Sequence, residues 1–365
     1  MSTSNDTRPD GIDRERLRRE RLARCLAEMA AGDLDALVLG REGNVRYVSD
    51  ARRLWLAGPR PFGPGCVVVR ATGDVHLLST SSEGVPPGVP SAHLYALTWN
   101  PAQLAARLAR IPGLAAARTI GVDGWNPAAA RLLAHVAPAA RLGDGDAALR
   151  RARTVKTGDE VACIRAAADV AQAGLAAARE RLGADVTEPT LRGAFLSAIA
   201  ARAVTIPSFD GLLHPAVRPP LAALRCGVLR DGYEATLIRT YALAPDSGSA
   251  AARALAPRAE RLCQRLVAAC RVGAGAAELL ASYAAAQEAL PPFPIAHGVG
   301  LGCEPPLLGR DHVCDAGWRI EAGMVLALYA FVTDTEASYL TQDLVHVTAD
   351  GAVLLTAEPR APLAT

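Results

Sequence analysis

The sequence is poor in aromatic residues, in lysine and in long apolar runs. Aromatic residues account for only 4% of its 365 residues, although hydrophobic residues account for 50%. The cores must therefore be built mainly from Ala, Leu and Val. No run of about 18 apolar residues occurs, so we expect no transmembrane span. Residues 1–20 are polar and charged, which is unlike a signal or transit peptide.

Neither charge nor cysteine usage indicates a specialised partner or compartment. The net charge is +2, which gives no electrostatic basis for binding nucleic acid or a membrane surface. Lys156 is the only lysine, so almost every basic residue is arginine. The eight cysteines contain no Cys-x-x-Cys pair and lie in apolar segments, as buried free thiols usually do. We therefore expect a cytoplasmic protein with reduced thiols.

The length exceeds that of one typical domain, so two domains are expected. Short apolar runs alternate with helical patterns over the first 150 residues, which predicts a small α/β domain. We expect disorder over residues 1–12, a first domain over 13–150 and a second over 151–365. The segment from Arg153 to Glu160 is expected to be a linker that leads into a long helix.

Hydrophobic periodicity predicts the main elements of both domains. In the first, strands are expected at 36–39, 66–69, 75–78 and 119–122, with helices at 13–31, 101–110 and 128–136. In the second, helices are expected at 159–182, 188–202, 249–272 and 276–289, with strands from His297 onward. The second domain also contains a strand, a Gly turn and a strand between Arg225 and Thr240.

That strand pair resembles the metal-binding hairpin of the pita-bread hydrolases: methionine aminopeptidase, Xaa-Pro aminopeptidase, proline dipeptidase and creatinase. Gly232-Tyr233 and Arg239-Thr240 stand where the family has Gly-Tyr and Arg-Thr. In the metal-binding members the hairpin carries two aspartates eleven residues apart, and these positions hold Arg225 and Thr236. The segment from Leu34 to Tyr47 resembles the creatinase N-terminal domain. The resemblance implies a small α/β domain followed by a pita-bread domain, a mixed α/β (α+β) class.

The remaining ligand positions of the family can be matched in the same way. His297 begins a His-Gly-x-Gly segment, so the ligand histidine is present. The glutamate that ends the phrase Glu-Pro-Gly-Met-Val-Leu-x-x-Glu is replaced by Tyr329, and the last glutamate is replaced by Gln342. A divalent site needs several anionic oxygens or neutral imidazoles, and the guanidinium of Arg225 stays protonated. We therefore expect no catalytic metal and no other cofactor.

The resemblance to metal-independent creatinase implies a histidine as acid and base. His214 lies in a loop that resembles the histidine loop of creatinase, and an imidazole titrates close to working pH. The alternative is a loop histidine with only local hydrogen bonds. His297 is the second candidate, and its alternative is a former ligand that packs against Tyr329 or Gln342. Tyr329 can donate to a developing oxyanion or simply fill the volume of the metal.

Six residues are candidates for binding substrate. A buried Arg225 needs an anion, either a substrate carboxylate or an internal acid such as Asp343 or Asp231. Glu304 stands seven residues after His297, where it can bind a cation, or it is the structural glutamate that many relatives have before a proline. The other candidates are Gln342 and Thr236 at replaced ligand positions, Arg239 of the Arg-Thr pair, and Arg60, which corresponds to a substrate-binding arginine of creatinase.

Three functions are compatible with these residues. The first is a metal-independent enzyme that acts on a small amino-acid-like or guanidino substrate by C–N hydrolysis or a tailoring step. The second is a binding module without activity, and the third is a functioning Xaa-Pro metallopeptidase. The replaced positions hold side chains that can all donate or accept hydrogen bonds, which favours small-molecule chemistry. A homodimer is implied by the resemblance alone.

Overall fold

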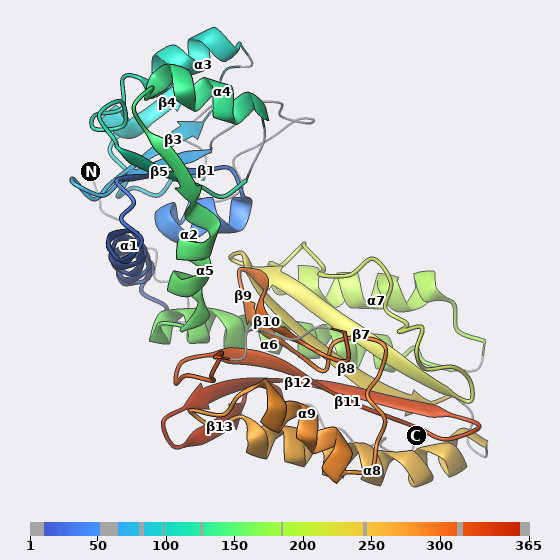
Figure 1. Cartoon of the computed structure of the whole chain (residues 1–365). Helices are drawn as coiled ribbons and strands as arrows, with labels where there is room; N and C mark the ends of the chain where they lie inside the picture. Colours follow the sequence, from blue (N-terminus) through green and yellow to red (C-terminus); the bar gives the residue numbers. More distant parts are fainter. Residues whose placement is uncertain are drawn as a thin grey trace. The chain divides into compact units, whose positions relative to one another are not determined.

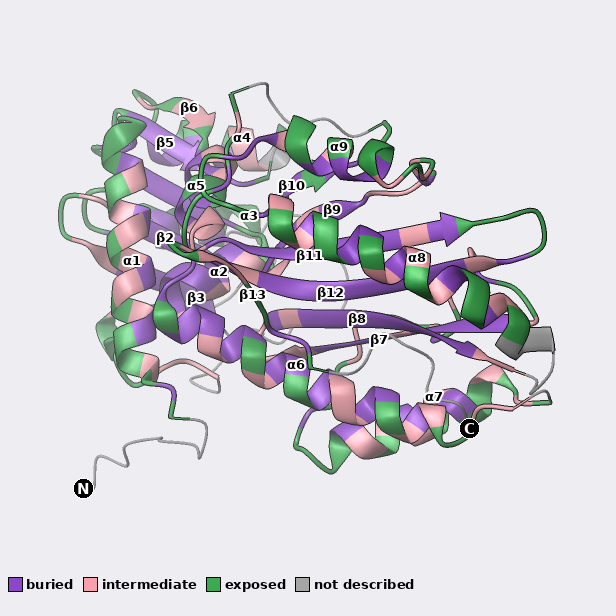
Figure 2. Ribbon diagram, turned by 90° about the horizontal axis from the view of Figure 1, so that it is seen from below, coloured by how far each residue is buried: buried purple, intermediate pink, exposed green. Residues whose placement is uncertain are grey.

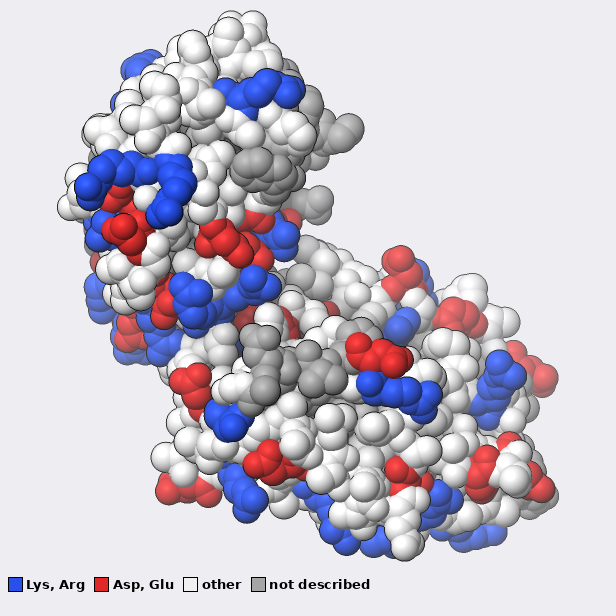
Figure 3. Space-filling model, in the orientation of Figure 1, with Lys and Arg blue, Asp and Glu red and all other residues white. Residues whose placement is uncertain are grey.

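The computed structural model describes residues 11–51, 65–79, 84–96, 98, 100–124, 127–183, 185–243, 247–311 and 317–357. Arg60 and Cys314 lie outside the described residues. The contacts divide the chain into two compact units, Met1–Arg153 and Thr154–Thr365. The face of the molecule drawn in Figure 3 has acidic and basic side chains interspersed, in keeping with the low net charge.

The first unit is built on a mixed sheet of six strands in the order β4-β3-β2-β1-β5-β6 (Figure 1). Strands β1–β2 and β2–β3 pair antiparallel, whereas β3–β4, β1–β5 and β5–β6 pair parallel. The strands are β1 (Ala36–Leu39), β2 (Cys66–Val69), β3 (Asp74–Ser79), β4 (Leu94–Ala96), β5 (Thr119–Val122) and β6 (Arg141–Asp144). The helices are α1 (Arg14–Ala31), α2 (Glu42–Ser49), α3 (Pro101–Leu108), α4 (Pro127–Val136), α5 (Gly145–Thr154) and the 3-10 turn η1 (Ser91–His93).

Aliphatic side chains hold this unit together, as the composition requires. Leu104 and Leu108 of α3 and Leu133 of α4 are buried in one cluster with Val67 and Ile120 of the sheet. Helix α1 begins at a side-chain cap, where Asp13 accepts from the N–H of Arg16 at 2.9 Å. Its apolar residues Leu17, Cys25 and Met29 are buried, together with Arg21, whereas Leu22 and Leu26 are half-buried.

The second unit contains a sheet in the order β10-β9-β11-β12-β8-β7, with β13 paired to β12. The strands are β7 (Leu221–Arg230), β8 (Tyr233–Ala242), β9 (Ala296–Gly300), β10 (Gly302–Leu308), β11 (Val325–Thr333), β12 (Ser338–Thr348) and β13 (Gly351–Leu354). The helices are α6 (Gly158–Arg179), α7 (Glu188–Ala200), α8 (Ser247–Ala269) and α9 (Ala276–Ala285). Strands β7 and β8 form a hairpin whose turn residues, Asp231 and Gly232, both have positive φ, the backbone that a two-residue turn requires.

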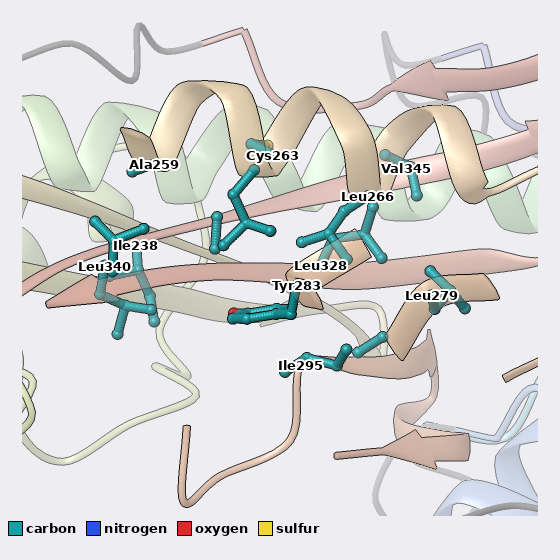
Figure 4. Close-up of a cluster of buried hydrophobic side chains, with 14 of the residues drawn as sticks. Ile238, Ala259, Cys263, Leu266, Leu279, Tyr283, Ile295, Leu328, Leu340 and Val345 are labelled. Carbon is teal, nitrogen blue, oxygen red and sulfur yellow. The ribbon is translucent and has the colours of Figure 1, made fainter. Parts of the chain in front are cut away.

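Both helix pairs cover the same face of this sheet (Figure 2). Tyr233 of β8 donates to Glu160 of α6 at 3.1 Å, so the odd-numbered residues of β8 face α6. On that same face, Cys263 of α8 contacts Asp343 of β12. In Figure 4 the α8 side chains Cys263 and Leu266 are drawn in one buried cluster with Leu328 and Val345 of the sheet. The opposite face of the sheet, which carries the even-numbered residues of β8, does not pack against these helices.

The predicted mixed α/β class is confirmed. The segment expected to be a linker is instead mostly helical, because α5 runs to Thr154 and a capping box of Thr157 and Glu160 starts α6 almost at once. The short edge strands β4 and β6 were not expected, since β4 is a run of only three apolar residues and β6 has no apolar run. Among the described helices, only α6 is long and apolar enough to span a membrane, and 56% of its apolar window is buried, as in a core helix.

Candidate active site

Five of the predicted residues project from the face of the sheet that the helices leave uncovered. Asp343 faces α8, so alternation turns Gln342 the other way. Gln342 is the register partner of Tyr329, and Ala327, two residues before Tyr329, is the partner of His297. Cross-strand partners point to the same side. Thr236 and Arg225 belong to this face by the same reasoning, through the registers of β8 and β7.

His297 and Tyr329 form a pair at the centre of this face. The Tyr329 hydroxyl lies 3.4 Å from Nδ1 of His297, and the ring centroids are 5.7 Å apart. Burial lowers the pKa of His297 to about 4 and raises the pKa of Tyr329 well above its ordinary value. Tyr283 of α9 fixes the strand beneath, because its hydroxyl donates to the carbonyl of Tyr329 and accepts from the N–H of Phe331. Both members of the pair are therefore neutral near pH 7.

His214 lies in the loop before β7 and is held by the backbone on both sides. Its own N–H donates to the carbonyl of Ala223 at 2.9 Å, and its Nδ1 accepts from the N–H of Ala216 at 3.3 Å. Burial, and then the neighbouring charge of Arg225, lower the pKa of His214 to about 4. A neutral imidazole that accepts at Nδ1 carries its proton at Nε2. His214 is thus a hydrogen-bond donor at Nε2 in the resting state.

Arg225 is half-buried and only partly paired. Its Nη2 donates to the carbonyl of Gly211 at 3.3 Å, and its guanidinium lies 4.2 Å from the centroid of the Phe209 ring. Nε is buried and has no hydrogen-bond partner. Among the described residues, no carboxylate forms an ion pair with this arginine. A cation in this state is short of one anionic partner.

Gln342 is also incompletely paired. It is fully buried, and its Nε2 donates to the hydroxyl of Thr236 at 2.7 Å and to the carbonyl of the same residue at 3.2 Å. Only an amide nitrogen can bond to a carbonyl oxygen, which fixes the orientation of the group. Its Oε1 is buried without a partner. The site therefore contains one unsatisfied donor, on Arg225, and one unsatisfied acceptor, on Gln342.

The chain resembles known proteins both in part of its sequence and in its fold. Residues 21–155 match the model of the Creatinase/Prolidase N-terminal domain family. The first unit is a creatinase/prolidase N-terminal domain. The second unit has the pita-bread fold, and the two-domain arrangement along the chain is shared with solved Xaa-Pro peptidases. No curated protein sequence matches the chain.

Three solved structures illustrate how far the pita-bread fold is retained. An Xaa-Pro dipeptidase from Bacillus anthracis superposes with a TM-score of 0.75 at 15% identity, over 95% of this chain and 99% of that one. A prolidase from Pyrococcus horikoshii gives 0.75 at 16% identity, over 94% and 100%. A dipeptidase from Mycobacterium ulcerans gives 0.69 at 19% identity, over 96% and 98%. At these identities the likeness establishes the fold alone.

The residues on this face do not suit the divalent metal that the pita-bread fold holds in metallopeptidases. A metal needs several anionic or imidazole ligands, and of the positions matched here only His297 offers one. Arg225 adds a permanent positive charge, and the amide of Gln342 is already committed to Thr236. The chemistry of this donor set therefore disagrees with a metal centre, and no step of the proposed reaction passes through one.

Two predicted residues of the pita-bread unit are engaged elsewhere. Glu304 alternates with Cys303 on β10, and its carboxylate pairs with Lys156 at 2.7 Å while it accepts from the N–H of Leu301. Arg239 is buried and pairs with Asp343 at 2.6 Å, so Asp343 is committed to Arg239. Glu304 and Arg239 are therefore not part of the proposed site. Arg60 lies outside the described residues.

Two residues join the site that sequence patterns alone did not single out. Glu234 shares its face of β8 with Thr236, and burial raises its pKa. Cys303 is exposed, so the expectation of buried thiols is wrong for this residue. Burial first, and then the nearby charge of Glu234 among others, raise the pKa of both Cys303 and Tyr329. The alternation of Glu234 and Thr236 about one apolar residue was the signal available in the sequence.

Proposed function

We propose that this protein is a metal-independent enzyme that acts on a small amino-acid-like or guanidino substrate by histidine acid/base chemistry. The observation that carries the proposal is that two neutral histidines, His297 on the uncovered face of the sheet and His214 in the loop before β7, accompany two unsatisfied polar atoms of that face. Buried polar groups are nearly always hydrogen-bonded. Nε of Arg225 and Oε1 of Gln342 are exceptions, and a ligand with a carboxylate and an N–H group would satisfy both.

The two histidines are suited to different roles. His214 is held with its proton at Nε2, so it serves as a neutral donor that polarises an oxygen or nitrogen of the substrate. His297 has more freedom, because a tyrosine hydroxyl can accept from Nδ1–H as well as donate to Nδ1. When Nδ1 of His297 carries the proton, Nε2 is a free base. The hydroxyl of Tyr329 then orients that base, as the third member of a catalytic set does.

C–N hydrolysis follows from these roles. Nε2 of His297 takes a proton from a water molecule, whose oxygen forms a bond to the substrate carbon. Negative charge that develops on the substrate is stabilised by Nε2–H of His214. The imidazolium of His297 then returns its proton to the nitrogen of the breaking C–N bond, so that an amine leaves neutral. Arg225 binds the carboxylate and fixes the carbon in reach. A tailoring step needs the same base and the same donor.

The first experiment combines binding and turnover with purified full-length protein. The probes are creatine-like guanidino acids, Xaa-Pro dipeptides and simple amino acids. A ligand at 100 times its dissociation constant stabilises the protein by about 2.7 kcal/mol, a visible shift in the melting temperature. His297→Gln should keep that shift and lose turnover, whereas His135→Gln, which changes an exposed histidine of α4, should keep both.

The outcomes separate the candidate functions. Binding with no turnover of any probe supports a binding module. Turnover that requires an added metal restores the metallopeptidase. Full turnover in both His297→Gln and His214→Gln would show that neither histidine carries the proton. Cytoplasmic location, a homodimer and the absence of nucleic-acid or membrane partners complete the proposal. The buried free thiols Cys163 and Cys226 support a reducing location.

A further inference from the structure

A second group of chemically competent side chains lies in the first unit. Asp74 and His76 are two residues apart on β3, so they share a face of that strand. His93 ends η1 and directly precedes β4. Strands β3 and β4 pair parallel with Leu77 opposite Leu94, which brings the preceding residues His76 and His93 side by side.

The donor atoms of these three side chains already converge. One ligand atom from each of Asp74, His76 and His93 lies within 4.8 Å of the other two. The ring centroids of His76 and His93 are 4.3 Å apart. Tetrahedral coordination with bonds of about 2.0–2.2 Å needs donors about 3.3 Å apart. Asp74 and His93 are only half-buried, so their side chains can make this small adjustment.

His76 is the observation that indicates a ligand. Its side chain is 1% exposed, and neither Nδ1 nor Nε2 has a hydrogen-bond partner. A neutral imidazole has one donor and one acceptor nitrogen, and leaving both unpaired inside a protein is costly. Burial and the neighbouring His93 also lower the pKa of His76, which keeps it in the neutral form that binds metals. A cation on the acceptor nitrogen would satisfy it.

We propose that Asp74, His76 and His93 bind a divalent transition-metal cation, with Zn²⁺ as the best fit. Two imidazoles and one carboxylate are a common ligand set for zinc, with water in the fourth position. Oxygen-preferring cations such as Mg²⁺ or Ca²⁺ suit this set poorly because only one ligand is a carboxylate. The cation would join β3 to the edge strand β4 and hold the end of the six-stranded sheet. The site does not depend on the proposed reaction.

The test is a titration of the full-length, chelator-treated protein with Zn²⁺ by calorimetry and with Co²⁺ by visible absorption. We expect one equivalent of bound metal and a higher melting temperature. Asp74→Asn and His93→Gln change half-buried side chains, so both variants should fold. Each should weaken binding by more than about tenfold, since even outer-shell changes cost that much. His135→Gln, at an exposed histidine of the same unit, is the matched control.

Three results would overturn the proposal. The first is the absence of stoichiometric binding. The second is an unchanged affinity in Asp74→Asn and His93→Gln. The third is a loss of binding in Cys303→Ser, which would locate the metal on the sheet of the second unit and count against the proposed metal-free reaction instead. Binding that is lost only in the Asp74 and His93 variants supports the site, whatever the outcome of the turnover assay.

Discussion

Arg225 on β7 and Arg239 on β8 differ in how completely they are paired. Arg239 is 1% exposed, and its guanidinium donates to Asp343, to the carbonyls of Ile238 and Gln342 and to the hydroxyl of Thr341. Arg225 donates to one carbonyl, lies against the ring of Phe209 and keeps Nε unpaired.

The contrast shows that Arg239 stabilises the fold, whereas Arg225 has donors left for a ligand. A buried charge is tolerated when it is paired and hydrogen-bonded, as Arg239 is, and its removal then leaves Asp343 without its cation. Arg225 contributes little to the fold by the same measure, because few of its donors are used. Incomplete pairing of a half-buried cation is therefore the better sign of a ligand site than the presence of arginine in a family motif.

The largest effect is expected from breaking the complete network. Arg239→Leu should lower the free energy of unfolding by about 3–5 kcal/mol, the cost of leaving a buried charge without its partner. Urea denaturation followed by circular dichroism measures this loss. Arg225→Gln is the matched control and should change the stability by less than about 1 kcal/mol. Equal losses in the two variants would remove the distinction between the arginines.

The next effect tests whether Glu304 belongs to the fold or to the site. Glu304→Gln leaves Lys156 buried beside a neutral amide, so the free energy of unfolding should fall by about 2–3 kcal/mol. The affinity for any ligand found in the thermal panel should stay unchanged. A variant of normal stability with weakened ligand binding would return Glu304 to the substrate site.

Arg225 itself should affect binding more than stability. Arg225→Gln removes a hydrogen bond to a charged group, worth about 1.5–3 kcal/mol, so the affinity for a carboxylate ligand should fall by at least about tenfold. The melting temperature without ligand should hardly move. Arg218→Gln changes an exposed arginine of the preceding loop and serves as the control. Normal ligand affinity in Arg225→Gln would assign the carboxylate to another group.

Most helices and strands could be predicted from the sequence, whereas the ion pairs between charged side chains could not. Apolar periodicity located the long helices, because their buried stripes are regular, as Leu17, Cys25 and Met29 of α1 are. The helix α5 was not predicted: only its last two residues, Arg153 and Thr154, fell in the expected linker, and tertiary packing buries Ala148 and Leu149. The short strand β4 was missed because it has three residues and owes its form to pairing with β3.

The site shows the same limit at the level of single side chains. Matching to the ligand positions of the family identified Arg225 and Thr236 in the hairpin and Tyr329 and Gln342 in later segments, and the strand registers place all four on one face. Nothing in the sequence could show that Asp343 is taken by Arg239, since that depends on which face of β12 meets α8. The role of Glu304 was equally open, because its partner Lys156 lies far away in the sequence.

The smallest expected effect concerns the neutral state of His297. Its pKa is about 4 in the folded protein, against an ordinary value of 6.5. Between these values the unfolded chain binds more protons than the folded protein, so stability is complete above pH 6.5 and is lost as the pH falls toward 4. At pH 5.5 the burial of this histidine should lower the free energy of unfolding by about 1 kcal/mol relative to pH 7.5.

His297→Gln cannot take up that proton, so the difference in unfolding free energy between wild type and variant should shrink by this amount at the lower pH. The exposed control His135→Gln should track the wild type at both pH values. If the difference between wild type and His297→Gln were the same at pH 5.5 and pH 7.5, His297 would be protonated as easily in the fold as outside it, and its assignment as a neutral base on this face would be lost.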